Sequence, residues 1–315
     1  ISAKDYMDGT SNFYGVHSVT LYVDSVQVFN STTDKVLPDE NRMINGFTDY
    51  EELTRTRRLI MRSYKLPGNR LRLLHTNESR GAVTIDEERD YHFRYVLEDN
   101  FGNRRTYQFI VKGKRQDIPE YKPEANEMLY WNRANVIQKP GMELVVPRYY
   151  VYEDVPLRTD MRGDSSLIAF DYILDAGRTP IHSYCDLSIG LRHMPVADTT
   201  KYYIVQKAGK WRSSMGGKYA NGWIKTRVRS LGTFSVDVDT IAPQITPIGQ
   251  GGWRTSRNIR FRIKDMESGI GSYKVYIDGK FVLFGLKKGI LVIQDPEKVK
   301  KGVPHKLEVT VTDQC

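Results

Sequence analysis

The chain has 315 residues, 40% of them hydrophobic and 27% charged, which is the balance of an ordinary globular protein with about two to three domains. Its net charge of +9 comes from basic and acidic residues that are interleaved, and basic clusters such as residues 298–301 are short, so the sequence lacks the concentrated positive face of a nucleic-acid-binding domain. No apolar run approaches the ~18–20 residues that cross a bilayer. We therefore expect no nucleic-acid partner and no transmembrane segment in this chain.

One pattern of residues occurs twice, near the two ends of the chain. SVTLYVD at 18–24 corresponds to SYKVYID at 272–278, and YHFRYVLED at 91–99 corresponds to HKLEVTVTD at 305–313. Repeats at this scale indicate repeated modules. The first copy lacks an opening strand and the second lacks a closing strand. We therefore expect the first and last modules to be truncated at the chain ends, within a longer protein.

The first module is expected at 1–113. Val19, Leu21 and Val23 alternate with polar residues, which predicts a half-buried strand. Tyr22 and Asp99 are 77 residues apart, whereas their counterparts in the second copy are 37 apart, so the first module carries an insertion at about 30–75. Within it, residues 45–55 predict a short helix with Thr48 near its N-cap.

Later segments are separated by turn and linker signals. Residues 114–123 are polar, contain two prolines and predict a linker, followed by a β-sandwich module at 124–240 with strands at 143–146, 166–172, 202–205 and 232–238. A third module, incomplete at its C-terminus, occupies 241–315. Short strands with glycine-rich turns predict an all-β fold of three tandem immunoglobulin-like β-sandwich modules, the first with an inserted short helix.

Several phrases in order carry a family resemblance. VDTIAP at 238–243 is similar to the opening of bacterial immunoglobulin-like modules. Together with DYEE at 49–52, LPGN at 66–69, GGKYANGW at 216–223 and RSLGTF at 229–234, it resembles the region C-terminal to the catalytic domain in lysostaphin-like (LytM-type) zinc metallopeptidases of Bacteroidota. The resemblance covers nearly the whole chain. It implies a murein peptidase parent, with zinc in a catalytic domain outside these residues.

The family's zinc site needs an H-x-x-x-D segment and a later H-x-H, which place two histidines and one aspartate around the metal. None of the six histidines here forms H-x-H. His182 and Asp186 fit H-x-x-x-D, but we expect His182 to lie in a turn that enters a strand. Cys185 is expected to be a buried structural cysteine rather than a nucleophile. We therefore expect no catalytic residue and no cofactor in this chain, while the parent's status as an enzyme stays open.

Two further groups are candidate binding residues. Calcium prefers clustered oxygen ligands, and the candidates are Asp5, Asp8, Asp265 and Glu267, although turns that use Asp carboxylates as backbone acceptors explain the same residues. A sugar-binding site is sought first at Trp211 and Trp223, which flank the Gly216-Gly217 turn, although tryptophans also fill sandwich cores.

The interpretation that follows is a non-catalytic accessory or scaffold segment of a cell-envelope peptidoglycan metalloendopeptidase. It would position the enzyme or dock peptidoglycan or an envelope protein, in the periplasm or at the cell surface, with association to the outer membrane. The alternatives are an adhesin or glycan-binding surface protein, or a structural subunit of an outer-membrane complex, built from the same modules. A catalytic domain encoded upstream would distinguish the first interpretation from the others.

Overall fold

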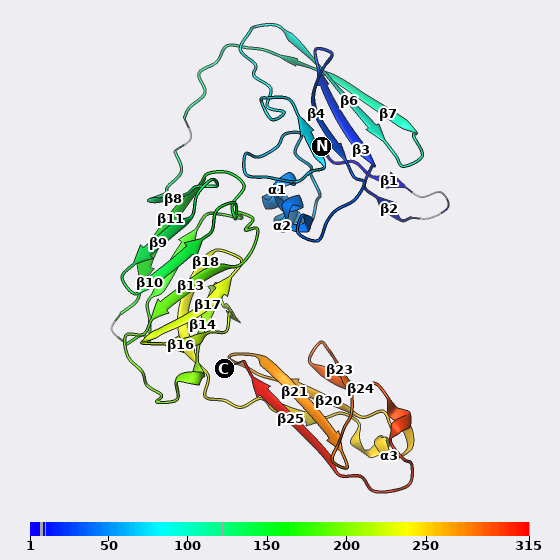
Figure 1. Cartoon of the computed structure of the whole chain (residues 1–315), viewed down its shortest axis with the longest axis vertical. Helices are drawn as coiled ribbons and strands as arrows, with labels where there is room; N and C mark the ends of the chain where they lie inside the picture. The colour runs from blue at the N-terminus through cyan, green and yellow to red at the C-terminus, as the bar shows by residue number, and fades with distance from the viewer. Residues whose placement is uncertain (7–8, 10, 121, 165, 315) are drawn as a thin grey trace.

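Antiparallel β-sheets account for most of the regular structure (Figure 1). The computed structural model describes residues 1–315 except 7–8, 10, 121, 165 and 315. The all-β class expected from the sequence is confirmed. In the described residues, no helix has the length and apolar character that a membrane crossing requires. We use module one, two and three for residues 1–113, 124–240 and 241–315.

Module one is built on a five-stranded sheet in the order β5-β4-β3-β6-β7. Its apolar face packs against the insertion, which supplies Met43, Leu66 and Leu71 to a common cluster of buried side chains. The layer opposite the sheet is thus an irregular segment, where we expected a second sheet. The elements are β1 (Asp5–Tyr6), β2 (Phe13–Tyr14), β3 (Ser18–Val23), β4 (Val26–Thr32), η1 (Asn41–Met43), α1 (Ile44–Phe47), α2 (Tyr50–Thr56), β5 (Leu74–Thr76), β6 (Asp90–Glu98) and β7 (Arg104–Lys112).

The insertion contains two short helices rather than one. Thr48 ends α1, and the N-cap of α2 is Asp49, whose carboxylate accepts a hydrogen bond from the Glu52 backbone N–H at 3.0 Å. Thr48 thus lies next to the N-cap, as expected, and the capping residue itself is Asp49. Asp49 is the better N-cap because its carboxylate is negatively charged, and this charge interacts favourably with the positive N-terminal end of the helix dipole.

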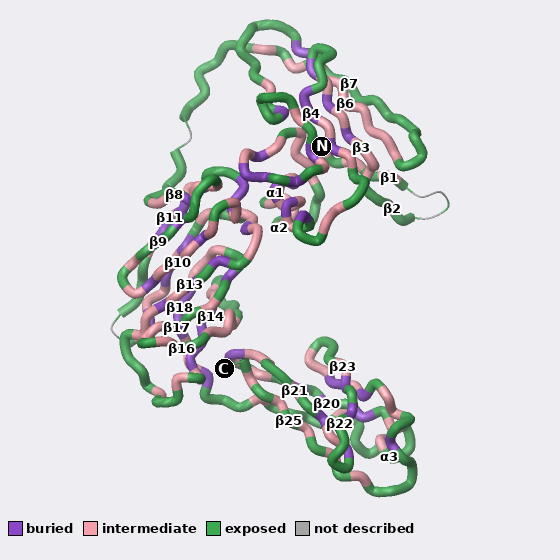
Figure 2. The backbone as a smooth tube through the Cα atoms, in the orientation of Figure 1, coloured by how far each residue is buried: buried purple, intermediate pink, exposed green. Residues whose placement is uncertain are grey.

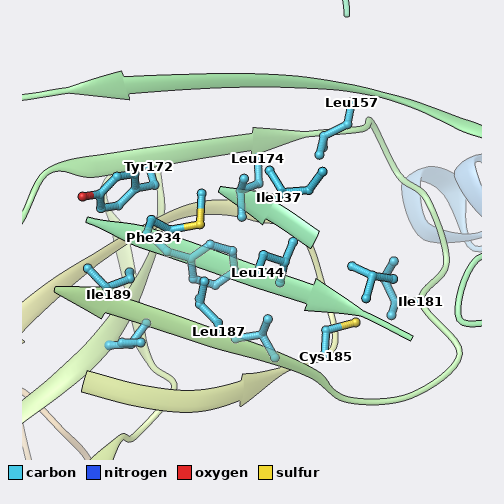
Figure 3. Close-up of a cluster of buried hydrophobic side chains, with 14 of the residues drawn as sticks. Ile137, Leu144, Leu157, Tyr172, Leu174, Ile181, Cys185, Leu187, Ile189 and Phe234 are labelled. Atoms are coloured by element: carbon cyan, nitrogen blue, oxygen red, sulfur yellow. The ribbon is translucent and has the colours of Figure 1, made fainter. Parts of the chain in front are cut away.

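Module two is a β-sandwich of two sheets, ordered β16-β17-β13-β10-β9 and β15-β14-β18-β12-β11-β8. Side chains of both sheets meet in one core, where Leu144 and Leu187 of the first face Leu174 and Phe234 of the second (Figure 3). The elements are β8 (Glu127–Leu129), β9 (Asn135–Lys139), β10 (Met142–Val146), β11 (Val155–Arg162), β12 (Asp171–Asp175), β13 (Cys185–Gly190), η2 (Thr199–Lys201), β14 (Tyr202–Ala208), β15 (Trp211–Ser214), β16 (Lys218–Ala220), β17 (Trp223–Val228) and β18 (Gly232–Val238).

Module three also has two sheets, β19-β20-β24-β23 and β22-β21-β25. They enclose a core that includes Phe261, Val275 and Leu291. The elements are β19 (Gln244–Pro247), η3 (Gln250–Gly252), α3 (Trp253–Ser256), β20 (Arg260–Lys264), β21 (Ile270–Ile277), β22 (Lys280–Phe281), β23 (Phe284–Lys287), β24 (Ile290–Ile293), η4 (Pro296–Lys298) and β25 (Leu307–Asp313).

The sequence repeat is also a structural repeat. β3 pairs with β6 as β21 pairs with β25. At the turn after each first strand, one aspartate accepts from a backbone N–H at the start of the closing strand: Asp24 from His92 of β6 at 2.9 Å, and Asp278 from Lys306, the residue before β25, at 2.8 Å. Both aspartates have positive φ, 48° and 50°, which an Asp tolerates better than most residues. The paired aspartates thus fix the same turn in both modules.

Candidate functional site

The apolar face of the module one sheet extends beyond the insertion that covers it. Residues directly opposite on neighbouring strands share a face, so the register places Leu21, Tyr95 and Tyr107 in one line across β3, β6 and β7. Leu21 is buried, Tyr95 is half-buried and Tyr107 is 60% exposed. The cover therefore stops near β6, and the same face continues into solvent on β7 (Figure 2).

Four aromatic rings form a continuous strip on that uncovered part, which we call the aromatic row: Phe93, Tyr95, Tyr107 and Phe109. The Phe109 ring lies 5.1 Å from Phe93 at an interplanar angle of 19°, 6.4 Å from Tyr95 and 5.8 Å from Tyr107. Such offset contacts hold the rings in place at separations typical of stable aromatic pairs. The row is thus an ordered, flat, apolar surface that remains accessible at Tyr107 and Phe109.

Polar groups border the aromatic row on two sides. The Tyr95 hydroxyl is 2.7 Å from the Ser63 hydroxyl of the insertion. Past Tyr107 there is a hollow of about 630 Å³ whose lining includes Asp99, Asn103 and Arg105. Binding sites for polar small molecules combine a mostly apolar surface with a few placed polar groups. The row and the hollow together meet that description.

Module one contacts module two through Tyr152, a residue of module two. The Tyr152 side chain is 3% exposed and packs in the buried cluster of module one. The Tyr152 hydroxyl donates to the Arg42 carbonyl at 2.8 Å and lies 3.1 Å from His182 Nδ1, while the Tyr152 carbonyl accepts from the Gly68 N–H at 2.7 Å. We call this contact the Tyr152 joint. It fixes the aromatic row relative to the middle module.

Burial and nearby charges shift the pKa values of both side chains at the Tyr152 joint. Burial, and after it the guanidinium groups of Arg70 and Arg42, lower the pKa of His182. Burial raises the pKa of the Tyr152 hydroxyl. Burial therefore favours the neutral form of both groups, and the guanidinium groups add to this effect for His182 alone.

His182 and Cys185 lie apart from any catalytic arrangement. His182 faces Tyr152 and Tyr150, whereas Asp186 is an exposed residue of β13 paired with Arg227. Cys185 is 1% exposed, and burial raises the pKa of its thiol to about 12 (Figure 3). Cys185 is thus a buried thiol, as expected. Across the described part of the chain, no group of three or more His, Cys, Asp or Glu side chains is placed to hold a metal.

Two of the four calcium candidates, Asp265 and Glu267, have backbone hydrogen-bond partners. Asp265 accepts from the Glu267 and Gly269 N–H groups, so its carboxylate shapes a turn. Glu267 accepts from the Thr240 N–H, and burial together with the neighbouring Asp239 carboxyl raises the pKa of Glu267. Asp5 lies in β1 opposite Tyr14, and Asp8 is outside the described residues.

Glu267, through Thr240, and two further carboxylates, Asp239 and Asp313, help to join modules two and three. Asp239 is fully buried and accepts from the Ser268 N–H at 3.0 Å and the Ile241 N–H at 3.0 Å. Asp313 lies 3.2 Å from the Lys201 ammonium of module two. Lys201 therefore provides the positive charge next to Asp313.

The two tryptophan candidates are not brought together. Trp211 is 80% exposed at the start of β15, in the six-stranded sheet. Trp223 starts β17 in the other sheet, where its ring covers Gly190. Sequence reasoning missed the aromatic row instead. The sequence pattern that could have predicted it is the alternation of aromatic residues at 91, 93 and 95 and at 107 and 109. In a strand, such alternation places these residues on one face.

Comparison with known proteins gives one family match. Residues 126–239 match the family described as the Zu5-like domain, so less than half of the chain, within module two, is similar to that family. No curated protein matches the chain.

Two solved structures are similar over most of the chain, but at low scores. One is described as a "Ca2+-stabilized adhesin" that "helps an Antarctic bacterium reach out and bind ice": 9% identity, 95% of this chain and 89% of the other, TM-score 0.15. The second is a "1.5-MDa bacterial ice-binding adhesin": 9% identity, 96% of this chain and 87% of the other, TM-score 0.14. Scores this low carry no argument about fold or function.

Proposed function

We propose that this chain is a non-catalytic binding segment of an exported cell-envelope protein, made of three tandem β-modules of immunoglobulin type. Its ligand contact is the aromatic row of module one, which stacks on the sugar rings of a cell-wall or surface glycan. The observation that carries this proposal is the ordered, partly exposed strip of Phe93, Tyr95, Tyr107 and Phe109. Aromatic rings offer a flat apolar surface to the C–H face of a sugar, and hydroxyl groups beside them take up its polar edge.

The two contacts between modules support a binding role rather than that of a flexible tether. Tyr152 and Asp239 are both buried where modules meet, so the aromatic row is held at a defined position relative to modules two and three. The resemblance to the region next to LytM-type catalytic domains favours peptidoglycan as the glycan. In that parent, this segment would hold the peptidase against its substrate polymer.

Co-sedimentation with purified, insoluble peptidoglycan tests the proposal. Tyr107→Ser with Phe109→Ser removes the exposed half of the row while leaving buried side chains untouched. We expect binding to weaken roughly tenfold or more, because two stacked rings are lost. Phe281→Ser, which removes a ring 62% exposed on module three, is the matched control and should bind as the unmodified chain does.

Two results would contradict this assignment. An unmodified chain that stays in the supernatant excludes peptidoglycan as the ligand. A loss of binding in Trp211→Ser, with the Tyr107 and Phe109 double variant unaffected, moves the glycan site to module two.

A further inference from the structure

A second cavity lies in module three, at the end that carries α3 and lies away from module two (Figure 1). It has a volume of about 420 Å³, within the ~300–1,000 Å³ range of small-molecule sites. Its floor is the end of the module core, formed by Trp253, Ile259, Ile277, Val299 and Leu307. Apolar side chains of the core therefore border an open cavity.

The rim of this cavity is positively charged. Arg254, Arg257 and Lys300 line it, and no carboxylate does. The ion pairs nearby join Lys298 to Asp295, His305 to Asp278 and Lys306 to Glu308. Within the described residues, the three rim cations form no ion pair with a carboxylate, although Arg257 donates to two backbone carbonyls.

A fourth cation is fixed at the rim by geometry. His305 Nδ1 lies 2.6 Å from the Asp278 carboxylate, and its Nε2 lies 2.8 Å from the Lys300 carbonyl. Both partners are acceptors, so both ring nitrogens must donate, and the ring is an imidazolium. Its charge is balanced by Asp278, which leaves the charges of Arg254, Arg257 and Lys300 as the excess.

From these contacts we infer that the end of module three binds a small amphiphilic anion, a single-chain alkyl carboxylate. Its chain would lie on the apolar floor, and its carboxylate would meet Arg254 and Lys300. Charge complementarity favours this class, because an uncharged apolar molecule leaves the rim cations unpaired and a cationic amphiphile is repelled. The site is independent of the aromatic row, since the two lie in different modules.

Calorimetric titration of the full chain with decanoate, below the concentration at which it forms micelles, tests the inference. We expect saturable binding with one decanoate per chain. Decyltrimethylammonium has the same chain length and the opposite charge, and acetate has the charge without the chain, so neither should bind. Affinity for decanoate should fall as salt is added, because the rim charges are exposed to solvent.

Paired variants locate the site. Arg254→Gln with Lys300→Gln should weaken decanoate binding by about tenfold at low salt. Each exposed cation that pairs with the carboxylate is expected to strengthen binding by up to about fivefold, and two such cations are lost. Lys287→Gln with Lys288→Gln removes the same charge from the β23–β24 hairpin and should bind unchanged. Val303→Asp puts a carboxylate on an exposed lining residue and should abolish binding, whereas Leu283→Asp, a similarly exposed position of module three outside the lining, should not.

Three outcomes would overturn the inference: no saturable decanoate binding, equal binding of decyltrimethylammonium, or equal loss of affinity in the Arg254/Lys300 and Lys287/Lys288 double variants. Each Asp substitution is at an exposed position, so retention of the fold is expected and is checked by circular dichroism. A failure here leaves the glycan proposal for module one untouched.

Discussion

Two histidines of this chain have opposite electrostatic surroundings. His182 is half-buried at the Tyr152 joint, where burial and then Arg70 and Arg42 lower its pKa. His305 is held by the Asp278 carboxylate and the Lys300 carbonyl, which raise its pKa. One ring is kept neutral and the other is kept charged. Their contributions to stability therefore depend on pH with opposite signs.

The first prediction concerns His182. Below a pH of about 6.5 the unfolded chain binds a proton at this ring that the folded chain does not bind, so stability falls as pH falls through that window. In urea unfolding between pH 5 and 8, His182→Gln should flatten the decline on the acid side. His305→Gln should instead reduce the loss of stability on the alkaline side. The stability that His305 contributes is complete below about pH 6.5 and is lost as pH rises through its raised pKa. Identical pH profiles for the two variants would contradict this assignment.

Cys185 gives a second prediction. Its thiol is buried and its pKa is raised to about 12, so almost no thiolate is present at neutral pH. In a chain with Cys315→Ser, a maleimide should label Cys185 only after denaturation. Complete labelling of the native chain would mean that this part of the module two core opens readily.

At the scale of elements, the insertion of module one acts as the missing layer of a sandwich. Asn69 organises it from inside: its side-chain amide donates to the Met43 carbonyl at 3.1 Å, and its side-chain oxygen accepts from the Leu71 N–H at 3.0 Å. Asn69 is buried, so water cannot replace these bonds. One side chain thus satisfies backbone groups of two segments that have no ladder partner.

Asn69→Ala should therefore destabilise module one by roughly 1–3 kcal/mol, because buried backbone groups lose their partners. Asn77→Ala is the control, since Asn77 is exposed and its bond to the Gly81 N–H can be replaced by water. Urea unfolding followed by tyrosine fluorescence measures both. Equal effects of the two substitutions would mean that the Asn69 bonds add nothing beyond those of an exposed turn.

Elements governed by local patterns could be predicted, and those governed by distant contacts could not. The alternation at 18–23 predicts a strand that the structure contains as β3. The strand expected at 166–172 begins only at Asp171, although Ala169 is packed in the core as a loop residue. The aromatic row follows from alternation, but its exposure depends on how far the insertion reaches across the sheet. That extent is set by irregular contacts such as Ser63 with Tyr95, which have no sequence period.

At the scale of the whole molecule, the Tyr152 joint holds two modules whose cores are otherwise separate. Gly46 is needed there, because a Cβ at this position would lie 2.7 Å from Cδ2 of Tyr152. Gly68 is equally close-packed, 2.9 Å from the Tyr152 carbonyl oxygen by the same measure. The joint therefore requires two glycines of module one to face one tyrosine of module two.

Gly46→Val should open the joint without altering module two. We expect an increased radius of gyration in small-angle scattering and faster proteolysis of the linker at 114–123, which would then move freely. Gly15→Val is the matched control, since nothing lies within 4 Å of a Cβ there. An unchanged radius of gyration would show that the joint tolerates the substitution or that modules one and two are held elsewhere.

Because the linker at 114–123 already connects the two modules, the Tyr152 joint closes a ring within one chain. Its two halves meet at an effective concentration on the order of 1 mM, as expected for a short tether. A pair of surfaces that would bind each other with a Kd of only about 0.1 mM as separate molecules would here be closed about ten times as often as open. A contact as small as the Tyr152 joint, with the Arg62–Glu153 ion pair at 3.7 Å next to it in the chain, is thus sufficient to favour one arrangement of the two modules.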